Sequence, residues 1–259
     1  MTQKGRFSSV EVVAFAILTA LLAVVVYHSR QQTRRQQQDF YSAAAIAELD
    51  LLKPYAGMAH SSRNFEEFII RDAFQDRRGG VFLDVGASHH QRDSNTYYLE
   101  TALGWSGIAV DALQEFAAGY QAHRPRTRFV AMFASDVTDS SVPLFVPNND
   151  QVSSVDPAFA KQGGGTPTAR LVPTTTLNAV LDAASVPSID FLSMDIELAE
   201  PKALAGFDID RFQPELVCIE AHWQVRQAIL DYFADHGYVV VGKYLRIDPY
   251  NLYFKPKTR

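Results

Sequence analysis

The sequence predicts an α/β domain in which helices cover a mostly parallel sheet. From residue 81 onward, five short apolar runs alternate with segments of helical composition. Several of these runs carry an acid at or near their end, for example Asp84 and Asp111. Two further strand-like runs, residues 238–242 and 250–254, close the domain around a turn at residues 248–249. Together these observations predict a Rossmann-like sheet whose last strand is antiparallel.

The predicted elements follow one another in a regular order. The first strand, residues 81–85, is a short apolar run typical of parallel strands that are buried on both faces. The other four strands are expected at residues 108–110, 128–132, 189–197 and 215–220, and a short extra strand at residues 142–146. Helices are expected at residues 43–52, 64–74, 95–103, 113–123, 174–184, 199–204 and 224–236. The long, loosely patterned segment 147–173 is predicted to be an insertion on the substrate side.

The charge of the chain is uneven. Residues 1–38 carry five basic side chains and one acidic side chain, a net charge of +4, so the overall charge of −5 leaves −9 on the remainder. Because nucleic-acid binding needs a basic surface, an acidic body argues against nucleic acid as the main partner. The single cysteine, Cys218, lies in an apolar run and is expected to be a small buried hydrophobe.

An uncharged apolar stretch covers residues 12–27. With Val10 included, the span at about 1.5 Å per residue is about 27 Å, just long enough to cross the hydrocarbon core of a bilayer, and we expect an uncleaved single-pass anchor. A cleaved signal peptide and a buried helix are the alternatives. Basic residues flank both sides, so they do not fix the orientation. The predicted organisation is therefore a membrane anchor with a basic linker (1–38), a helical lead-in (39–80) and the main domain (81–259).

Two acids and one glycine mark the predicted ligand site. Ligands of open α/β sheets bind beyond the carboxyl ends of the strands, where the strand order reverses. Gly86 allows a sharp turn and a close approach to the backbone. Asp84 suits a cationic ammonium group, and Asp111 suits ribose hydroxyls. S-adenosylmethionine has both groups.

A dinucleotide site is the main rival for this region. It would show the pattern Gly-x-Gly-x-x-Gly, which lets helix N–H groups bind a pyrophosphate. The chain has one glycine here, Gly86, and the carboxylate of Asp84 would repel a pyrophosphate. A methyl-donor site is therefore favoured. Ser88 is assigned to the same loop, and Ser135 or Asp136, after the third strand, to contact with the adenine amine, with a surface turn as the alternative.

Five segments, taken together and in order, resemble the FkbM family of S-adenosylmethionine-dependent methyltransferases. They are Val81-Phe-Leu-Asp-Val-Gly-Ala, Ser94-Asn-Thr-Tyr-Tyr-Leu-Glu, Leu103-Gly-Trp-Ser-Gly-Ile, Ile189-Asp-Phe-Leu-Ser-Met-Asp-Ile-Glu and Pro214-Glu-Leu-Val-Cys-Ile-Glu. The resemblance implies a class I methyltransferase fold and O-methylation, often of a sugar or polyketide hydroxyl. By position it assigns Asp84 and Gly86 to the cofactor loop, Asp111 to the ribose site, and Asp195 and Glu197 to an Asp-x-Glu signature.

The chain departs from the family pattern at two places. The cofactor loop reads Ser88-His89-His90, with His90 near the place of a further glycine. After Glu197 the chain reads Leu198-Ala199-Glu200, where the family usually has Gly-Ala-Glu. Both changes remove glycine at positions where the backbone is expected to take a positive φ or to approach another group closely.

Methyl transfer to a hydroxyl requires an aligned acceptor and a group that accepts the proton. His222 follows Glu220 at a strand's carboxyl end and is our candidate base, with His89 and His90 as rivals. Asp195 and Glu197 lie two residues apart, on the same side of a strand. They are expected to serve as base, to bind acceptor hydroxyls or to hold a cation. Because two carboxylates are too few ligands for a metal, no metal site is assigned.

The functional prediction is a membrane-anchored O-methyltransferase that acts on a hydroxyl of a glycan or a lipid-linked acceptor. Trp223, beside His222, is a candidate platform for that acceptor. The alternative is a membrane-tethered binding or scaffold protein that has lost turnover with the loop glycine. Because S-adenosylmethionine is made in the cytosol, the domain is expected on the cytosolic side of the membrane.

Overall fold

The structure, a computed structural model, describes residues 24–29, 32 and 50–257. Almost all of the predicted anchor, residues 12–27, lies outside these residues. Among the described residues, no helix is both long and apolar enough to cross a bilayer. The chain divides into two compact units, Met1–Pro54 and Tyr55–Arg259. The second unit contains the sheet and the candidate site.

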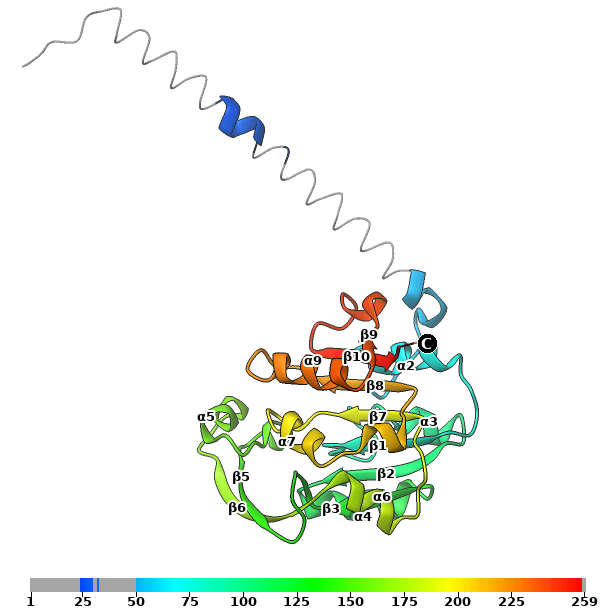
Figure 1. Ribbon diagram of the computed structural model, residues 1–259, viewed down its shortest axis with the longest axis vertical. Helices are drawn as coiled ribbons and strands as arrows, with labels where there is room; N and C mark the ends of the chain where they lie inside the picture. Colours follow the sequence, from blue (N-terminus) through cyan, green and yellow to red (C-terminus); the bar gives the residue numbers. More distant parts are fainter. Residues whose placement is uncertain (1–23, 30–31, 33–49, 258–259) are drawn as a thin grey trace, which may run out of the picture. The chain divides into compact units, whose positions relative to one another are not determined.

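A seven-stranded sheet forms the centre of the second unit, in the order β3-β2-β1-β7-β8-β10-β9 (Figure 1). Its strands are β1 (Val81–Val85), β2 (Ser106–Asp111), β3 (Thr127–Ala131), β7 (Phe191–Met194), β8 (Leu216–Glu220), β9 (Tyr238–Val240) and β10 (Asn251–Pro256). Strands β3, β2, β1, β7 and β8 pair in parallel. Strand β10 lies antiparallel between β8 and β9. The predicted Rossmann-like sheet with an antiparallel last strand is confirmed.

Helices cover both faces of this sheet. They are α2 (Glu66–Phe74), α3 (Tyr97–Thr101), α4 (Ala117–His123), α6 (Leu177–Ala183), α7 (Glu200–Ala205), α8 (Ile209–Phe212) and α9 (Arg226–Asp235). Side chains of α6 to α9 pack in one apolar cluster with alternate residues of the strands, such as Leu83 and Val85. On the opposite face Phe74 of α2 contacts Phe191, and Tyr120 of α4 packs on Ala109. These two layers bury the sheet from both sides, as expected for a parallel sheet.

A second, three-stranded sheet extends from the end of β3. It has the order β4-β6-β5 and is formed by β4 (Phe133–Ala134), β5 (Ser141–Val146) and β6 (Thr168–Thr175). The predicted strand at 142–146 is confirmed. The helix predicted from residue 174 begins later, because Thr174 and Thr175 pair with β4 and Thr176 caps α6 by accepting the Ala179 N–H. β-branched threonines favour the extended backbone that this pairing requires.

The strand order reverses between β1 and β7, which are neighbours in the sheet although far apart in sequence. Gly86, directly after β1, has φ +81°. A Cβ atom at this position would lie 1.7 Å from the carbonyl oxygen of Asp195. The glycine predicted for close approach is therefore required by the packing of the two strand ends against each other.

Candidate functional site

A cavity of about 500 Å³ opens where the parallel strands end. Its walls include Gly86 after β1, Asp111 at the end of β2, Asp195 after β7 and Glu220 at the end of β8. This is the position expected for a ligand site in an open α/β sheet, at the switch in strand order. Its volume falls within the range of small-molecule sites.

Asp111 occupies one end of the cavity and is held by the backbone. One carboxylate oxygen accepts the Ser88 N–H at 2.9 Å, and the other accepts the Leu113 N–H at 2.8 Å. Burial raises the pKa of Asp111 to about 6, and these two hydrogen bonds oppose the shift. Both oxygens keep a free lone pair, so the carboxylate can accept further hydrogen bonds from ligand hydroxyls.

Ser88 follows the tight turn at Gly86 and lines the same part of the cavity. It has φ +46°, and its Oγ is buried without a hydrogen-bond partner among the described residues. A buried hydroxyl without a partner is costly, so this atom is suited to bind a ligand group. The assignment of Ser88 to the ligand loop stays a prediction that this geometry favours.

Apolar side chains form the wall beside Asp111. Leu113, Phe133 and Leu144 pack together in one cluster and line the cavity. The neighbouring Ser135 and Asp136 do not line it. Ser135 is fully buried and donates its Oγ–H to the exposed Asp136 at 2.9 Å.

Asp84 lies behind the loop that follows β1, which begins at Gly86, and is not part of the cavity wall. Because side chains alternate along β1, Asp84 shares a face with Phe82, which is the face covered by α2, α3 and α4. Its carboxylate accepts the Thr96 Oγ–H at 2.7 Å. Burial raises its pKa to about 6, although the Thr96 hydrogen bond and the Arg124 charge oppose the shift. The structure therefore gives Asp84 no direct contact with the cavity.

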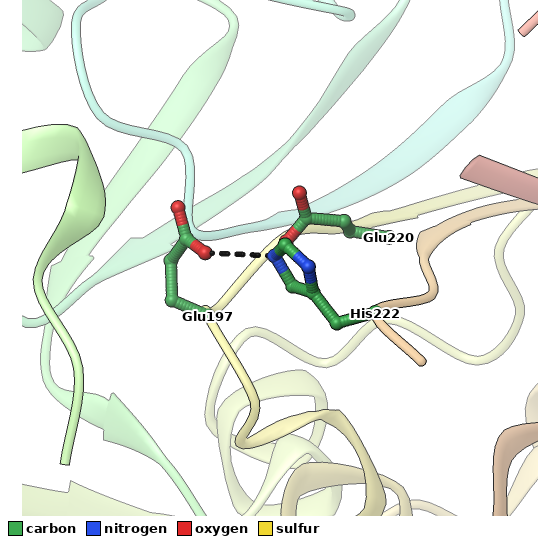
Figure 2. Close-up of side chains that lie close together, drawn as sticks. All are labelled: Glu197, Glu220 and His222. Carbon is green, nitrogen blue, oxygen red and sulfur yellow. Dashed lines mark hydrogen bonds and ion pairs between the residues drawn. The ribbon is translucent and has the colours of Figure 1, made fainter. Parts of the chain in front are cut away.

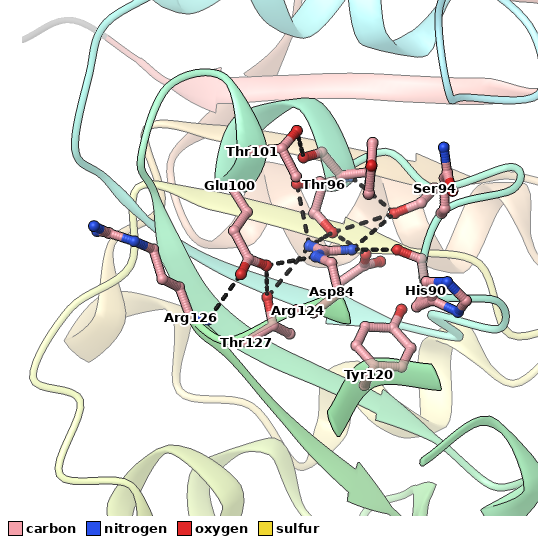
Figure 3. A network of polar contacts seen from close by, with 12 residues as sticks. Asp84, His90, Ser94, Thr96, Glu100, Thr101, Tyr120, Arg124, Arg126 and Thr127 are labelled. Carbon is pink, nitrogen blue, oxygen red and sulfur yellow. Dashed lines mark hydrogen bonds and ion pairs between the residues drawn. The ribbon is translucent and has the colours of Figure 1, made fainter. Parts of the chain in front are cut away.

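Arg124 is the centre of a buried polar network behind this loop (Figure 3). Its guanidinium forms an ion pair with Glu100 and donates to the His90 carbonyl at 2.8 Å and to Thr96 Oγ1 at 3.1 Å. A single buried cation thus ties α4 to α3 and to the loop after β1. Arg124 was not predicted from the sequence, since an arginine at the end of a helix is usually exposed.

His90 points away from the cavity. Its ring stacks on His89 at a centroid distance of 4.1 Å and on His123 at 4.7 Å. Neither His89 nor His90 lines the cavity. Burial lowers the pKa of both histidines. His90, which stands near the place of the family's further glycine, therefore does not enter the cavity, and neither histidine is placed to act as a base there.

Glu197, Glu220 and His222 meet at the other end of the cavity (Figure 2). His222 Nε2 lies 3.2 Å from Glu197 Oε2 and 3.0 Å from Glu220 Oε2. The second distance allows an ion pair, but the angles do not form a hydrogen bond, so Glu220 Oε2 has no hydrogen-bond partner among the described residues. Asp195 lies beside them and faces the open cavity. The structure thus brings together the three residues predicted to act on the acceptor.

The end of the cavity formed by Asp195, Glu197, Glu220 and His222, here called the acidic end, favours neutral side chains. Burial and the neighbouring carboxylates raise the pKa of Glu197 and Glu220, that of Glu197 to about 8. Burial lowers the pKa of His222, and the charge of Asp195 opposes this shift. His222 is therefore neutral near pH 7 and able to accept a proton.

The segment after Glu197 takes the backbone conformation expected of a glycine. Leu198 has φ +79° and Glu197 has φ +53°. A positive φ costs about 1–2 kcal/mol for an L-residue other than glycine. The departure from the family pattern at Leu198 thus leaves the turn in place at the cost of backbone strain, and the turn carries Glu197 into the cavity.

The predicted insertion forms the wall of the cavity near His222. Residues 149–153 and Phe159 line the cavity, and the Phe159 ring contacts the His222 ring edge-on at 4.9 Å. Gln151 donates to Asp93 at 2.9 Å and so ties this segment to the loop after β1. An insertion that lies over the acidic end is well placed to contact a substrate.

Several polar residues of the site were not found from sequence. Arg63, Asn64 and Asn251 line the cavity, although the first two precede the predicted domain. Glu200 and Glu220 complete the acidic end. Glu220 could have been recognised as the acid that ends β8, two residues before His222, whereas the contribution of the segment before α2 has no sequence signal.

A family model described as Methyltransferase FkbM domain matches residues 84–240. The search of curated proteins gave no match. Among solved structures, the chain is similar to a TehB-like SAM-dependent methyltransferase from Corynebacterium glutamicum, with 13% identity, 85% of this chain and 100% of that chain covered, and a TM-score of 0.43. It is also similar to a SAM-dependent O-methyltransferase from Thermotoga maritima, with 10% identity, 80% and 71% covered, and a TM-score of 0.42.

The family match covers more than half of the chain and includes β1 from Asp84, the cofactor loop, the acidic end and His222. The strand order and the place of the cavity agree with it. The chain belongs to the FkbM family of S-adenosylmethionine-dependent methyltransferases.

Proposed function

We propose that this chain is an O-methyltransferase that methylates a hydroxyl of a glycan or a lipid-linked acceptor. The observation that carries this proposal is the pairing of His222 with Glu197 on the wall of the cavity that also contains Asp111. One cavity thus offers a site for the methyl donor at one end and groups that accept a proton at the other.

The residues at the Asp111 end fit S-adenosylmethionine. Asp111 would hold the ribose hydroxyls, and the wall of Leu113, Phe133 and Leu144 would cover the adenine. The unpartnered Ser88 Oγ would hydrogen-bond the amino-acid part. When bound, the cofactor supplies an electrophilic methyl group on a sulfonium.

The residues at the acidic end supply proton transfer. As the acceptor oxygen forms its bond to the methyl carbon, its proton passes to Nδ1 of His222, because the other ring nitrogen, Nε2, faces Glu197 Oε2 at 3.2 Å. This contact with Glu197 orients the ring. Phe159 packs on the His222 ring and limits its rotation. General base catalysis of this kind contributes about 10²–10⁴-fold to a rate.

The acceptor side of the cavity carries hydrogen-bonding groups suited to a polyol. Arg63, Asn64, Gln162 and Asn251 line it. A glycan presents many hydroxyls and binds best where such groups converge. Trp223, 84% exposed and next to His222, offers a ring face on which a sugar or an acyl chain can pack.

The lipid-linked acceptor and the membrane location rest on the predicted anchor, residues 12–27. An anchored enzyme would meet a substrate that is confined to a membrane. The cytosolic orientation rests on the cytosolic origin of the methyl donor. The scaffold alternative depended on the loss of the loop glycine, near whose place His90 stands. Since His90 does not line the cavity, the enzyme is the function that the geometry favours.

Methyl transfer from radiolabelled S-adenosylmethionine to lipid-linked and free oligosaccharides tests the proposal. We expect label in an alkali-stable methyl ether, and loss of that label in His222→Gln. Label in a methyl ester or an N-methyl group would contradict O-methylation of a hydroxyl, and transfer unaffected by His222→Gln would remove the assigned base.

A further inference from the structure

Three carboxylates at the end of the cavity lie close enough to share one cation. Asp195 follows β7, Glu200 begins α7 and Glu220 ends β8. One oxygen of each lies within 4.8 Å of the others. Two oxygens on opposite sides of a cation, each at about 2.1–2.6 Å from it, are about 4–5 Å apart. The spacing therefore suits a hard divalent cation.

Glu200 gives an independent indication of a ligand here. Its side chain is fully buried. One carboxylate oxygen accepts the Ile196 N–H at 3.0 Å, and Oε2 has no hydrogen-bond partner among the described residues. Glu220 Oε2 is also buried and lacks a hydrogen-bond partner there. Two buried carboxylate oxygens without donors, in one group of three carboxylates, need a counter-ion or protons.

The surrounding chain supplies little positive charge. No Lys or Arg in the described part of the chain forms an ion pair with Asp195, Glu200 or Glu220. The charge of Arg63 acts on Asp195, but at more than ion-pair distance. His222 reaches Glu220 but is shared with Glu197. The Arg124 network shows, by contrast, how this fold neutralises a buried acid when it does so with its own side chains.

We propose that Asp195, Glu200 and Glu220 bind a divalent cation such as Mg²⁺ or Mn²⁺. All three ligands are carboxylates, the type that these ions prefer. Asp195 faces the open cavity, so positions on the cation that the protein does not fill are directed toward the acceptor. Water or acceptor oxygens occupy these positions.

The cation would add substrate selectivity to the site. A cation beside His222 would bind a hydroxyl oxygen of the acceptor and lower its pKa, which helps the proton to leave. Acceptors with two neighbouring hydroxyls, which can bind through both oxygens, are then preferred. This role rests on the proposed methyl transfer, whereas cation binding itself does not.

Titration of Mn²⁺ into the full-length chain, followed by electron paramagnetic resonance of the free ion, tests the site. We expect one Mn²⁺ per chain with Kd below about 1 mM, displaced by Mg²⁺. Glu200→Gln, which keeps the shape and can still accept the Ile196 N–H, should weaken binding at least about tenfold. Glu215→Gln, at the opposite end of β8, is the matched control and should bind as the wild type does.

The outcomes separate this inference from the proposed function. A chain that binds S-adenosylmethionine but no Mn²⁺ up to several millimolar overturns the cation site and leaves the methyltransferase intact. Mn²⁺ binding that is lost in His222→Gln but kept in Glu200→Gln would also overturn it, because the ion would then lie between Glu197, Glu220 and His222. Thermal unfolding of each variant shows whether it is folded.

Discussion

At the β2 end of the cavity, Asp111 accepts two backbone N–H groups, and behind the loop Asp84 accepts a threonine hydroxyl near the Arg124 charge. At the β7 and β8 end, Glu200 and Glu220 each keep a buried oxygen without a hydrogen-bond donor among the described residues. Asp111, which has a donor on each carboxylate oxygen, keeps a fixed geometry for ligand hydroxyls. Buried carboxylate oxygens without a donor attract protons or cations, which suits the end where a proton is to be moved.

The largest expected effect lies at the acidic end. His222→Gln should lower kcat by about 10²–10⁴-fold, because it removes the proton acceptor. S-adenosylmethionine affinity should stay unchanged, since Asp111 ends β2 and His222 follows β8, and two strands, β1 and β7, lie between β2 and β8 in the sheet. Steady-state kinetics measure kcat, and calorimetry measures the affinity for the methyl donor. A parallel loss of donor affinity would mean that the two ends do not act separately.

The buried cation behind the cofactor loop gives the next effect. Arg124→Met leaves Glu100 buried without its partner and should lower the free energy of unfolding by about 3–5 kcal/mol. Arg170→Met removes an exposed pair with Glu115 and should cost less than about 1 kcal/mol. Urea denaturation of both variants makes the comparison. Equal costs would show that Arg124 does not hold the loop.

Asp84 makes the stability depend on pH. Its pKa is about 6 in the folded chain and 3.8 as the ordinary value, so the folded state binds the proton more tightly. Its contribution to stability is present below about pH 4 and is lost as the pH rises through 6. Relative to Asp84→Asn, which does not titrate, the wild type should lose about 2–3 kcal/mol between pH 4 and pH 7. A difference that is constant across this range, measured by urea denaturation, would contradict the assigned pKa.

The turn after Glu197 gives the smallest effect. Leu198→Gly should be more stable than Leu198→Ala by about 1 kcal/mol, because only glycine takes φ +79° without strain. Both variants lose the leucine side chain, so their difference isolates the backbone. Thermal unfolding resolves it. An alanine variant that is the more stable of the two would show that the turn is not strained.

The fold was largely predictable because its signals are local. The apolar runs ending near Asp84, Asp111 and Glu220 lie in the strands expected of them. Where the structure differs from the expectation, non-local packing decided the outcome. Asp84 was expected to bind the ligand, but strand alternation turns it toward Thr96. Arg63 and Arg124 gain their roles from contacts with segments distant in sequence, which periodicity cannot reveal.

The choice of ribose-side residues could be predicted only in part. Asp111 was assigned from its position at a strand end and lines the cavity. Asp136 was assigned, with Ser135, to the adenine amine because it follows the third strand, but the β4 pairing with β6 directs the chain away and leaves its side chain exposed. A position after a strand therefore does not decide by itself whether an acid reaches the cavity. The packing of the chain beyond the strand decides it.

Calorimetric titration of S-adenosylmethionine into the full-length chain and its Asp111→Asn and Asp136→Asn variants tests whether this cavity binds the methyl donor through Asp111. The structure predicts saturable binding by the wild type, binding weakened at least about tenfold in Asp111→Asn, and unchanged binding in Asp136→Asn. Folded protein that binds no S-adenosylmethionine at millimolar concentration, or binding that depends on Asp136 and not on Asp111, would contradict the assignment of this cavity as the methyl-donor site.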